Sequence, residues 1–156
     1  MTTPPFPGRL LGIDYGLKIV GLALSDPTGS LARPLQVLRR TSKQADFAAI
    51  NAIIQQHGAA AVVVGLPESP PDITVYTAAD RVRLWASRLA AAVDVAVYLW
   101  NERHSTQEAE ELLAEAGRAR PERVDAIAAA VILQSFLNAL RDEGFPWPDP
   151  VVPARD

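Results

Sequence analysis

The chain has 156 residues, of which 49% are hydrophobic and 21% charged, and its formal net charge is −3. This length suits one domain with a core of its own, and the charge argues against a protein that binds nucleic acid by bulk electrostatic attraction. Because the chain has no cysteine, disulfides, thiolate zinc sites and cysteine nucleophiles are excluded.

The first part of the chain predicts an antiparallel meander of three strands. Residues 1–8 are rich in proline and lack the basic-then-apolar layout of a signal peptide, so we expect a flexible arm. Strands are predicted over 9–15 and 18–25, and a third over 31–38, where Pro34 is typical of an edge or a bulge.

The rest of the chain alternates helices with strands. We expect these elements in chain order: a helix over 42–57, a strand over 59–66, a helix over 74–92, a strand over 93–100, a helix from 105 or 106 to 117, and a helix over 121–140. Strand 59–66 is apolar almost throughout, which is typical of a strand buried on both faces. After Gly144 the chain has four prolines and no periodicity, which predicts loop or disorder.

This order of elements predicts a single α/β domain over 9–141, between the arm 1–8 and a proline-rich tail 142–156. We expect a mixed five-stranded sheet, with three antiparallel strands followed by parallel strands and with helices on both faces. Such an order is that of a ribonuclease H-like core. The apolar runs break too early to span a bilayer, as where Asp94 interrupts one, so we expect a cytoplasmic protein.

Three acids, Asp14, Glu102 and Asp125, stand where the local pattern favours another residue. Asp14 ends the first strand and Glu102 follows the last, so both can converge at one sheet edge if those strands lie near each other. Asp125 lies in the first turns of the most apolar helix and can close the site. Such a cluster stays ionised only with cations, and oxygen ligands favour Mg²⁺ or Mn²⁺ over zinc. Two such ions would assist hydrolysis of a phosphodiester.

Each of these acids also has a simpler interpretation. Asp14 can accept hydrogen bonds from turn amides, Glu102 can pair with Arg103 or cap the next helix, and Asp125 stands where a helix dipole favours an acid. Only the three together favour catalysis. His104, close to Glu102, could contact a phosphate or move a proton, although a plain surface histidine is the simpler interpretation.

Arginines account for most of the basic residues and form groups. The groups are Arg39, Arg40 and Lys43, then Arg81, Arg83 and Arg88, and finally Arg118, Arg120 and Arg123. An arginine fork suits phosphate oxygens, but solvated helix faces explain any single group more simply.

Several segments together resemble the YqgF family of bacterial ribonuclease H-like nucleases, which are described as pre-16S rRNA nucleases or Holliday junction resolvases. The resemblance runs from about Leu10 to Leu140 and rests on residues 12–18, 20–26 and 64–67, on Glu102-Arg103 with Ser105-Thr106, and on Asp125 with Ala128-Ala129 and Ile132-Leu133. These motifs occur in the order of the family and are specific as a set.

The resemblance implies Asp14, Glu102 and Asp125 as metal-binding acids and Lys18 and Arg103 as phosphate contacts. It also implies a role in trimming the 5′ end of 16S rRNA or in processing branched DNA.

The chain departs from the family pattern in four places. Asn101 stands where the family usually has an aspartate before Glu-Arg; an amide can still ligate a cation, but the site loses one charge. Ile19 replaces the usual arginine, the loop after Pro67 lacks the usual glycine-serine turn, and His104 replaces an apolar residue.

These observations predict a nuclease that uses Mg²⁺ or Mn²⁺ and acts in 5′-end maturation of pre-16S rRNA, with the small ribosomal subunit as a partner and no membrane. A resolvase of Holliday junctions or branched DNA is the alternative; it needs a dimer whose two sites face a symmetric substrate. No dimer stripe is visible in the sequence, so we expect a monomer or a weak dimer.

Two other classes of protein stay open. A catalytically weak, ribosome-associated factor that binds nucleic acid is compatible with Asn101 and with the missing arginine. An actin-like ATP-binding module also carries a strand-end Gly-Ile-Asp-x-Gly, but it needs two domains and this length supplies one.

Overall fold

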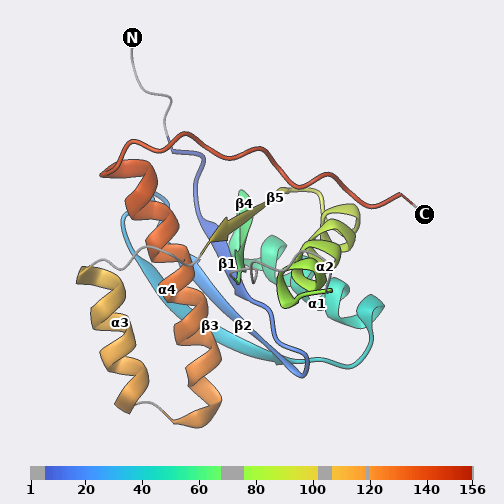
Figure 1. Ribbon diagram of the computed structural model, residues 1–156, viewed down its shortest axis with the longest axis horizontal. Coiled ribbons are helices and arrows are strands. Elements are labelled where there is room, and N and C mark those ends of the chain that lie inside the picture. The colour runs from blue at the N-terminus through green and yellow to red at the C-terminus, as the bar shows by residue number, and fades with distance from the viewer. Residues whose placement is uncertain (1–5, 68–75, 102–106, 119, 156) are drawn as a thin grey trace.

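The computed structural model describes residues 6–67, 76–101, 107–118 and 120–155 (Figure 1). Its elements in chain order are β1 (Leu10–Asp14), β2 (Ile19–Ser25), β3 (Ala32–Arg39), α1 (Lys43–His57), β4 (Ala61–Leu66), α2 (Ala78–Ala92), β5 (Ala96–Asn101), α3 (Gln107–Arg118) and α4 (Pro121–Arg141). Both the predicted meander and the alternation that follows it are therefore present.

The five strands form one mixed sheet in the order β3-β2-β1-β4-β5. β1 pairs antiparallel with β2 and parallel with β4, and β4 pairs parallel with β5. The expected mixed sheet is confirmed, and β1 occupies its centre. The first and last strands are not neighbours, however, because β4 lies between them.

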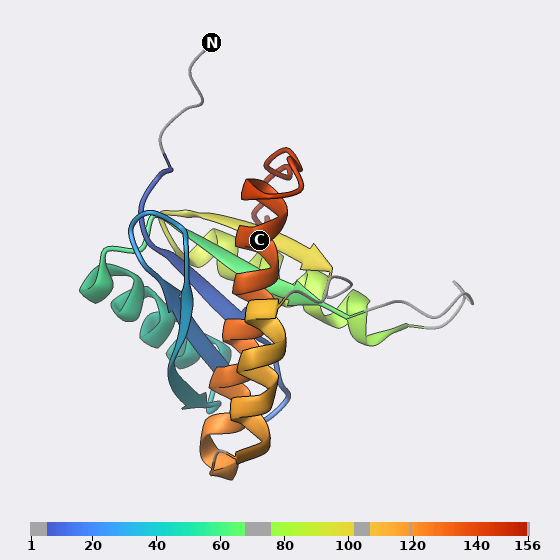
Figure 2. The ribbon, with the colours of Figure 1, turned by 90° about the vertical axis from the view of Figure 1, so that its left-hand side faces the viewer.

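Helices cover both faces of the sheet, as predicted (Figures 1 and 2). On one face, α1 and α2 pack over apolar side chains that include Leu11 and Ile13 of β1. On the other face, α4 packs over Leu10 and Val63, and α3 lies beside α4 (Figure 2). The central strands are thus buried on both sides, which explains the continuous apolar run of β4.

Local capping groups set the ends of the helices on the first of these faces. Ser42 caps α1 by accepting a hydrogen bond from the backbone N–H of Ala45, and Gly58 ends the helix with a φ of 66°. α2 begins at Ala78 rather than at the predicted residue 74, because Thr77 and Asp80 form a capping box. The pattern Thr-x-x-Asp was the signal for this start.

α4 does not fit the expectation that the apolar runs are too short to span a bilayer. By length and composition it is apolar enough to cross a bilayer, and 67% of its most apolar stretch is buried inside the fold. The expectation that every apolar run breaks too early is therefore wrong for this helix. Its apolar residues instead cover one face of the sheet.

The tail after Gly144 has no regular secondary structure, yet its backbone is held against the domain. The N–H of Val151 donates to the carbonyl of Val97 in β5 at 2.7 Å, and the N–H of Ala154 donates to the carbonyl of Ser87 in α2 at 2.9 Å. The tail therefore runs from the end of α4 across β5 to α2 (Figure 1) and covers part of an open sheet edge.

Candidate active site

Asp14 is the last residue of the central strand, and its side chain lies on the face covered by α4. Side chains alternate along a strand, and Leu11 and Ile13 point into the core beneath α1 and α2. Gly12 points the other way, toward Leu133 of α4. Asp14 shares the face of Gly12 and is half-buried there.

Asp125 lies over the same face, next to Asp14. In the sheet Gly21 stands directly opposite Asp14, a pairing in which the Cα atoms are roughly 4.5–5.5 Å apart. A Cβ built on Gly21 would lie 1.8 Å from the backbone carbonyl oxygen of Asp125. The backbone of Asp125 therefore rests on the residue opposite Asp14, and the structure brings these two predicted site residues together.

Two strand glycines make this close approach possible. At Gly21 a side chain would collide with the first turns of α4, and at Gly12 a Cβ would lie 2.8 Å from the Cβ of Leu133. Glycines inside strands often mark such an approach of another backbone. They are the sequence signal for the position of α4, and hence for the position of Asp125.

Asn101 is not brought together with Asp14. It is the exposed last residue of β5 and stands in register with Leu66 of β4. Leu66 belongs to the core beneath α1 and α2, so alternation places Asn101 on the face opposite to that of Asp14.

Of the four remaining predicted site residues, the structure describes Lys18. Lys18 is exposed in the turn between β1 and β2, where its carbonyl accepts the N–H of Arg40 at 2.9 Å. Glu102, Arg103 and His104 lie outside the described residues.

A hollow of about 330 Å³ opens beside Asp14. It is lined by residues 14–17, by the end of β4 and by the first turns of α2, which contribute Arg81. Arg81 is exposed, and its guanidinium brings a positive charge to the hollow that Asp14 lines. In the sequence this arginine was one of a group that a solvated helix face explained more simply.

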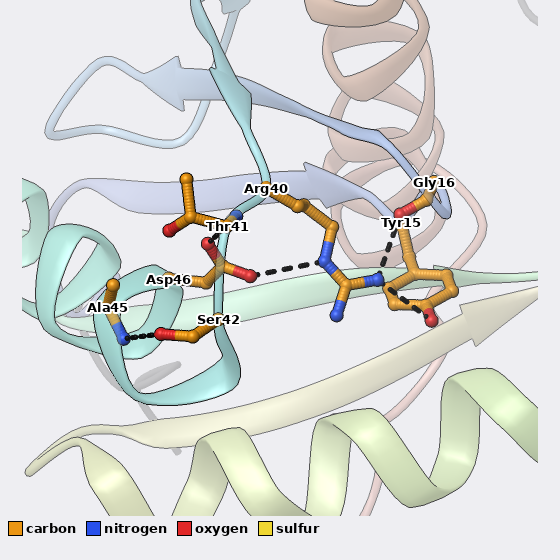
Figure 3. A network of polar contacts seen from close by, with 7 residues as sticks. All are labelled: Tyr15, Gly16, Arg40, Thr41, Ser42, Ala45 and Asp46. Atoms are coloured by element: carbon orange, nitrogen blue, oxygen red, sulfur yellow. Dashed lines mark hydrogen bonds and ion pairs between the residues drawn. The ribbon is translucent and has the colours of Figure 1, made fainter.

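A polar network holds the turn that follows Asp14 (Figure 3). Arg40 donates to the hydroxyl of Tyr15 at 3.1 Å and to the carbonyl of Gly16 at 3.2 Å, and its guanidinium lies 5.0 Å from the centre of the Tyr15 ring. Its Nε donates to the carboxylate of Asp46 at 3.2 Å. That carboxylate is only 2% exposed and also accepts the N–H of Thr41.

This network gives Arg40 a structural role. Burial acts to lower the pKa of Arg40, but the hydrogen bonds with Tyr15 and Asp46 outweigh it and leave that pKa raised. The guanidinium is therefore committed to the loop that positions Asp14 and is not one of a solvated group of surface cations.

Arg40→Met is expected to lower the free energy of unfolding by about 1.5–3 kcal/mol, because it removes charge-assisted hydrogen bonds and leaves Asp46 buried with fewer partners. Urea denaturation measures the loss. Arg39→Met is the matched control, since Arg39 is exposed at the end of β3. Equal stability of the two variants would contradict a role for Arg40 in fixing the turn.

The donors at this edge fit a hard cation. Within residues 6–67, 76–101, 107–118 and 120–155, no group of three histidines or acids is placed to hold a metal ion. Asp14 and Asp125 are instead two half-buried acidic residues whose backbones lie close together on either side of Gly21. Mg²⁺ is commonly held by one or two carboxylates together with waters and substrate phosphates, so this pair fits Mg²⁺ or Mn²⁺.

Comparisons with known proteins agree with this architecture. Residues 8–139 match the family model described as RuvX, Holliday junction resolvase. A protein of Pelotomaculum thermopropionicum named "Putative pre-16S rRNA nuclease" is 41% identical over 135 residues, covering 84% of this chain and 87% of that protein. A protein of the same name from Ruegeria pomeroyi is 39% identical over 142 residues, covering 89% and 91%.

Solved structures show the same fold at lower identity. T. thermophilus RuvC in complex with Holliday junction substrate aligns with a TM-score of 0.57 at 19% identity, covering 85% of this chain and 95% of that chain. The fowlpox virus Holliday junction resolvase aligns with a TM-score of 0.50 at 9% identity, covering 84% and 99%. The predicted ribonuclease H-like fold is thereby confirmed.

Proposed function

Because this chain belongs to the RuvX family, the YqgF family that its motifs resemble, we propose that it is a nuclease that hydrolyses phosphodiester bonds with bound Mg²⁺ or Mn²⁺. One observation carries the metal site: the backbone of Asp125 rests on Gly21, directly opposite Asp14. Two acidic residues from distant parts of the sequence thus have their backbones close together at the end of the central strand.

The residues divide into ligands and phosphate contacts. Asp14 and Asp125 bind the cation, and Glu102, which follows β5, is the third acid. Bound metal supplies charge that stabilises the attacking and leaving oxygens of the phosphodiester. Asn101 is left out of this ligand set, because strand alternation directs it to the other face of the sheet.

Positive side chains near the acids hold the substrate backbone. Arg81 lines the hollow beside Asp14, and Lys18 is exposed in the adjacent turn. A guanidinium fork and an ammonium group both suit phosphate oxygens. Arg103 adds a further phosphate contact, and His104 contacts a phosphate or moves a proton.

The substrate is the 5′ region of pre-16S rRNA, and the enzyme acts in the cytoplasm as a monomer or weak dimer in contact with the small ribosomal subunit. The names of the relatives from Pelotomaculum and Ruegeria support this choice. The description of the matching family model favours a second candidate, cleavage of Holliday junctions or other branched DNA, which requires a dimer.

A cleavage assay tests the proposal. End-labelled RNA that spans the 5′ leader of 16S rRNA, and a four-way DNA junction, are each incubated with the protein in Mg²⁺, in Mn²⁺ or with a chelator. We expect cleavage of the RNA with either ion and none with the chelator. Cleavage of the junction alone supports the second candidate, and no cleavage of either substrate overturns the proposal.

A further inference from the structure

Helices α1 and α2 meet on one face of the sheet through a pair of aromatic side chains (Figure 1). The ring centre of Phe47 in α1 lies 5.7 Å from that of Trp85 in α2, and both side chains are buried. Each helix is joined by a short connection to one of the parallel strands β4 and β5. The two helices therefore cross the sheet in the same direction.

Four polar side chains flank this aromatic pair, one helical turn to either side of it. They are Gln44 and Asn51 in α1 and Arg81 and Arg88 in α2. Residues three or four apart lie on the same face of a helix, so each polar pair shares a row with the aromatic residue between its members. All four are exposed or half-buried, which places them on the solvent side of the contact. We name these four residues the α1–α2 seam.

The seam carries positive charge in a chain whose formal net charge is −3. The only acids of the two helices, Asp46 and Asp80, are engaged elsewhere: Asp46 pairs with Arg40, and Asp80 closes the capping box with Thr77. Within the part of the chain that the structure describes, none of the four seam side chains takes part in a hydrogen bond or an ion pair. Their polar groups are therefore available to a ligand.

The charge of the helices differs between the two faces of the sheet. α3, which lies beside α4 on the other face, contains four glutamates and one arginine (Figure 1). A polyanion is repelled by α3 and attracted by the arginines of the seam. The face of α1 and α2 is therefore the one that suits the backbone of a nucleic acid.

The seam begins at the hollow beside Asp14 and leads away from it. Arg81 lines that hollow together with Asp14. Arg88 lies seven residues further along α2, which is about 10.5 Å at 1.5 Å per residue. One strand of a nucleic-acid duplex rises about 3.4 Å per nucleotide, so the two arginines are separated by about three nucleotides. A strand that is cut at Asp14 can therefore reach both arginines.

The side chains of the seam define the chemistry of the ligand. A guanidinium fork binds phosphate oxygens. An amide both donates and accepts hydrogen bonds, and so does the 2′-hydroxyl of a ribose. A chain of phosphates with hydroxyls between them, as in RNA, fits both kinds of group.

We propose that the α1–α2 seam binds the sugar–phosphate backbone of an RNA strand beside the scissile bond, with phosphates on Arg81 and Arg88. The amides of Gln44 and Asn51 contact its 2′-hydroxyls. The proposal rests on the proposed function and deepens it, because it gives the substrate a path beyond the site of cleavage. Contacts of this kind position a strand and read no base, so the affinity is independent of the sequence of the strand.

Binding measured without cleavage tests the proposal. Short fluorescein-labelled single strands of RNA and DNA with one sequence are titrated with the protein in a chelator at several salt concentrations, and fluorescence anisotropy gives the Kd. Arg88→Gln is expected to weaken binding of both strands by about 5-fold at about 0.1 M salt. The slope of log Kd against log salt should become shallower by about 0.7, the contribution of one phosphate contact on a single strand.

An amide variant tests the choice of RNA. Asn51→Ala is expected to weaken binding of RNA by about 2- to 10-fold, the effect of one hydrogen bond, and to leave binding of DNA unchanged. The reason is that only RNA carries the 2′-hydroxyl. The same titrations measure this difference between the two strands.

Two controls separate the seam from general effects of charge. Arg83→Gln removes the same charge from the same helix, but Arg83 is two residues from Arg81 and faces another side of α2. This variant should keep the Kd and the salt slope of the wild type. Arg88→Lys keeps the charge and should keep the slope. Thermal unfolding checks that each variant folds.

The outcomes decide the proposal independently of cleavage. Wild-type affinity and salt slope in Arg88→Gln, an equal change in Arg83→Gln, or no binding by the wild type overturns it. An equal loss for RNA and DNA in Asn51→Ala overturns the assignment to RNA. If the wild type binds as expected but cleaves nothing with Mg²⁺ or Mn²⁺, only the proposed nuclease function fails. If it cleaves RNA but Arg88→Gln binds like the wild type, only the seam fails.

Discussion

Asp14→Asn is expected to lower the rate of metal-dependent cleavage by at least about 10³-fold while the protein stays folded. A bound metal ion stabilises transition-state charge by several kcal/mol, and each 1.36 kcal/mol changes a rate tenfold. An amide at position 14 keeps the size of the side chain but removes the charge that holds the cation. Single-turnover cleavage of the labelled RNA with saturating Mn²⁺ measures the loss.

The matched control for this variant is Asp94→Asn, which removes the same charge from an exposed residue between α2 and β5. It should cleave at the rate of the wild type, and nucleic-acid binding by Asp14→Asn should be retained. Equal cleavage by Asp14→Asn and the wild type would sink the catalytic hypothesis. Binding without cleavage by either protein would point to a catalytically weak, ribosome-associated factor.

Gly21→Ala is expected to lower the free energy of unfolding by about 3 kcal/mol or more, at the upper end of the costs of overpacking. The new methyl group would meet the backbone of α4 at Asp125, and a backbone carbonyl cannot rotate away as a side chain can. Relief of this clash requires α4 to move off the sheet. The rate of cleavage should therefore fall by more than the decrease in folded protein explains, because Asp125 moves away from Asp14.

Gly117→Ala is the matched control, since a Cβ at Gly117 meets nothing within 4 Å and the residue lies in helix α3. That variant should be neutral or more stable by up to about 1 kcal/mol, the helix propensity gained. Urea denaturation of both variants, followed by cleavage assays on the folded proteins, compares them. If Gly21→Ala matches the wild type in stability and cleavage, the close contact between α4 and β2 is wrong.

Local signals in the sequence predicted most of the fold. The apolar run of residues 59–66 indicated a strand buried on both faces, and Ser42 and Gly58 indicated the two ends of α1. Each of these signals depends on residues close in sequence. The order of strands does not: the insertion of β4 between β1 and β5 is a non-local pairing that periodicity does not encode.

In the candidate site, too, local sequence signals predicted some residues and non-local packing placed the others. Asp14 and Asp125 stood out because each carboxylate interrupts an apolar pattern, and the structure places the backbone of Asp125 against Gly21, the residue opposite Asp14. Arg81 did not stand out, because an arginine on a helix gives no sign of which neighbour it will face. Asn101 stood out because it adjoins Glu102 in sequence, but the alternation of β5 places Asn101 on the face opposite to that of Asp14.

The convergence of Asp14 and Asp125 on one cation is tested most directly by Mn²⁺ binding, measured by electron paramagnetic resonance of the free ion. The wild type, Asp14→Asn, Asp125→Asn and the double variant are titrated in the absence of nucleic acid. Each single variant should lose most of the affinity of the wild type, and the double variant should lose little more, because the two carboxylates act on one site. Binding by Asp125→Asn as tight as that of the wild type would contradict the account and leave Asp125 as an ordinary acid near the start of a helix.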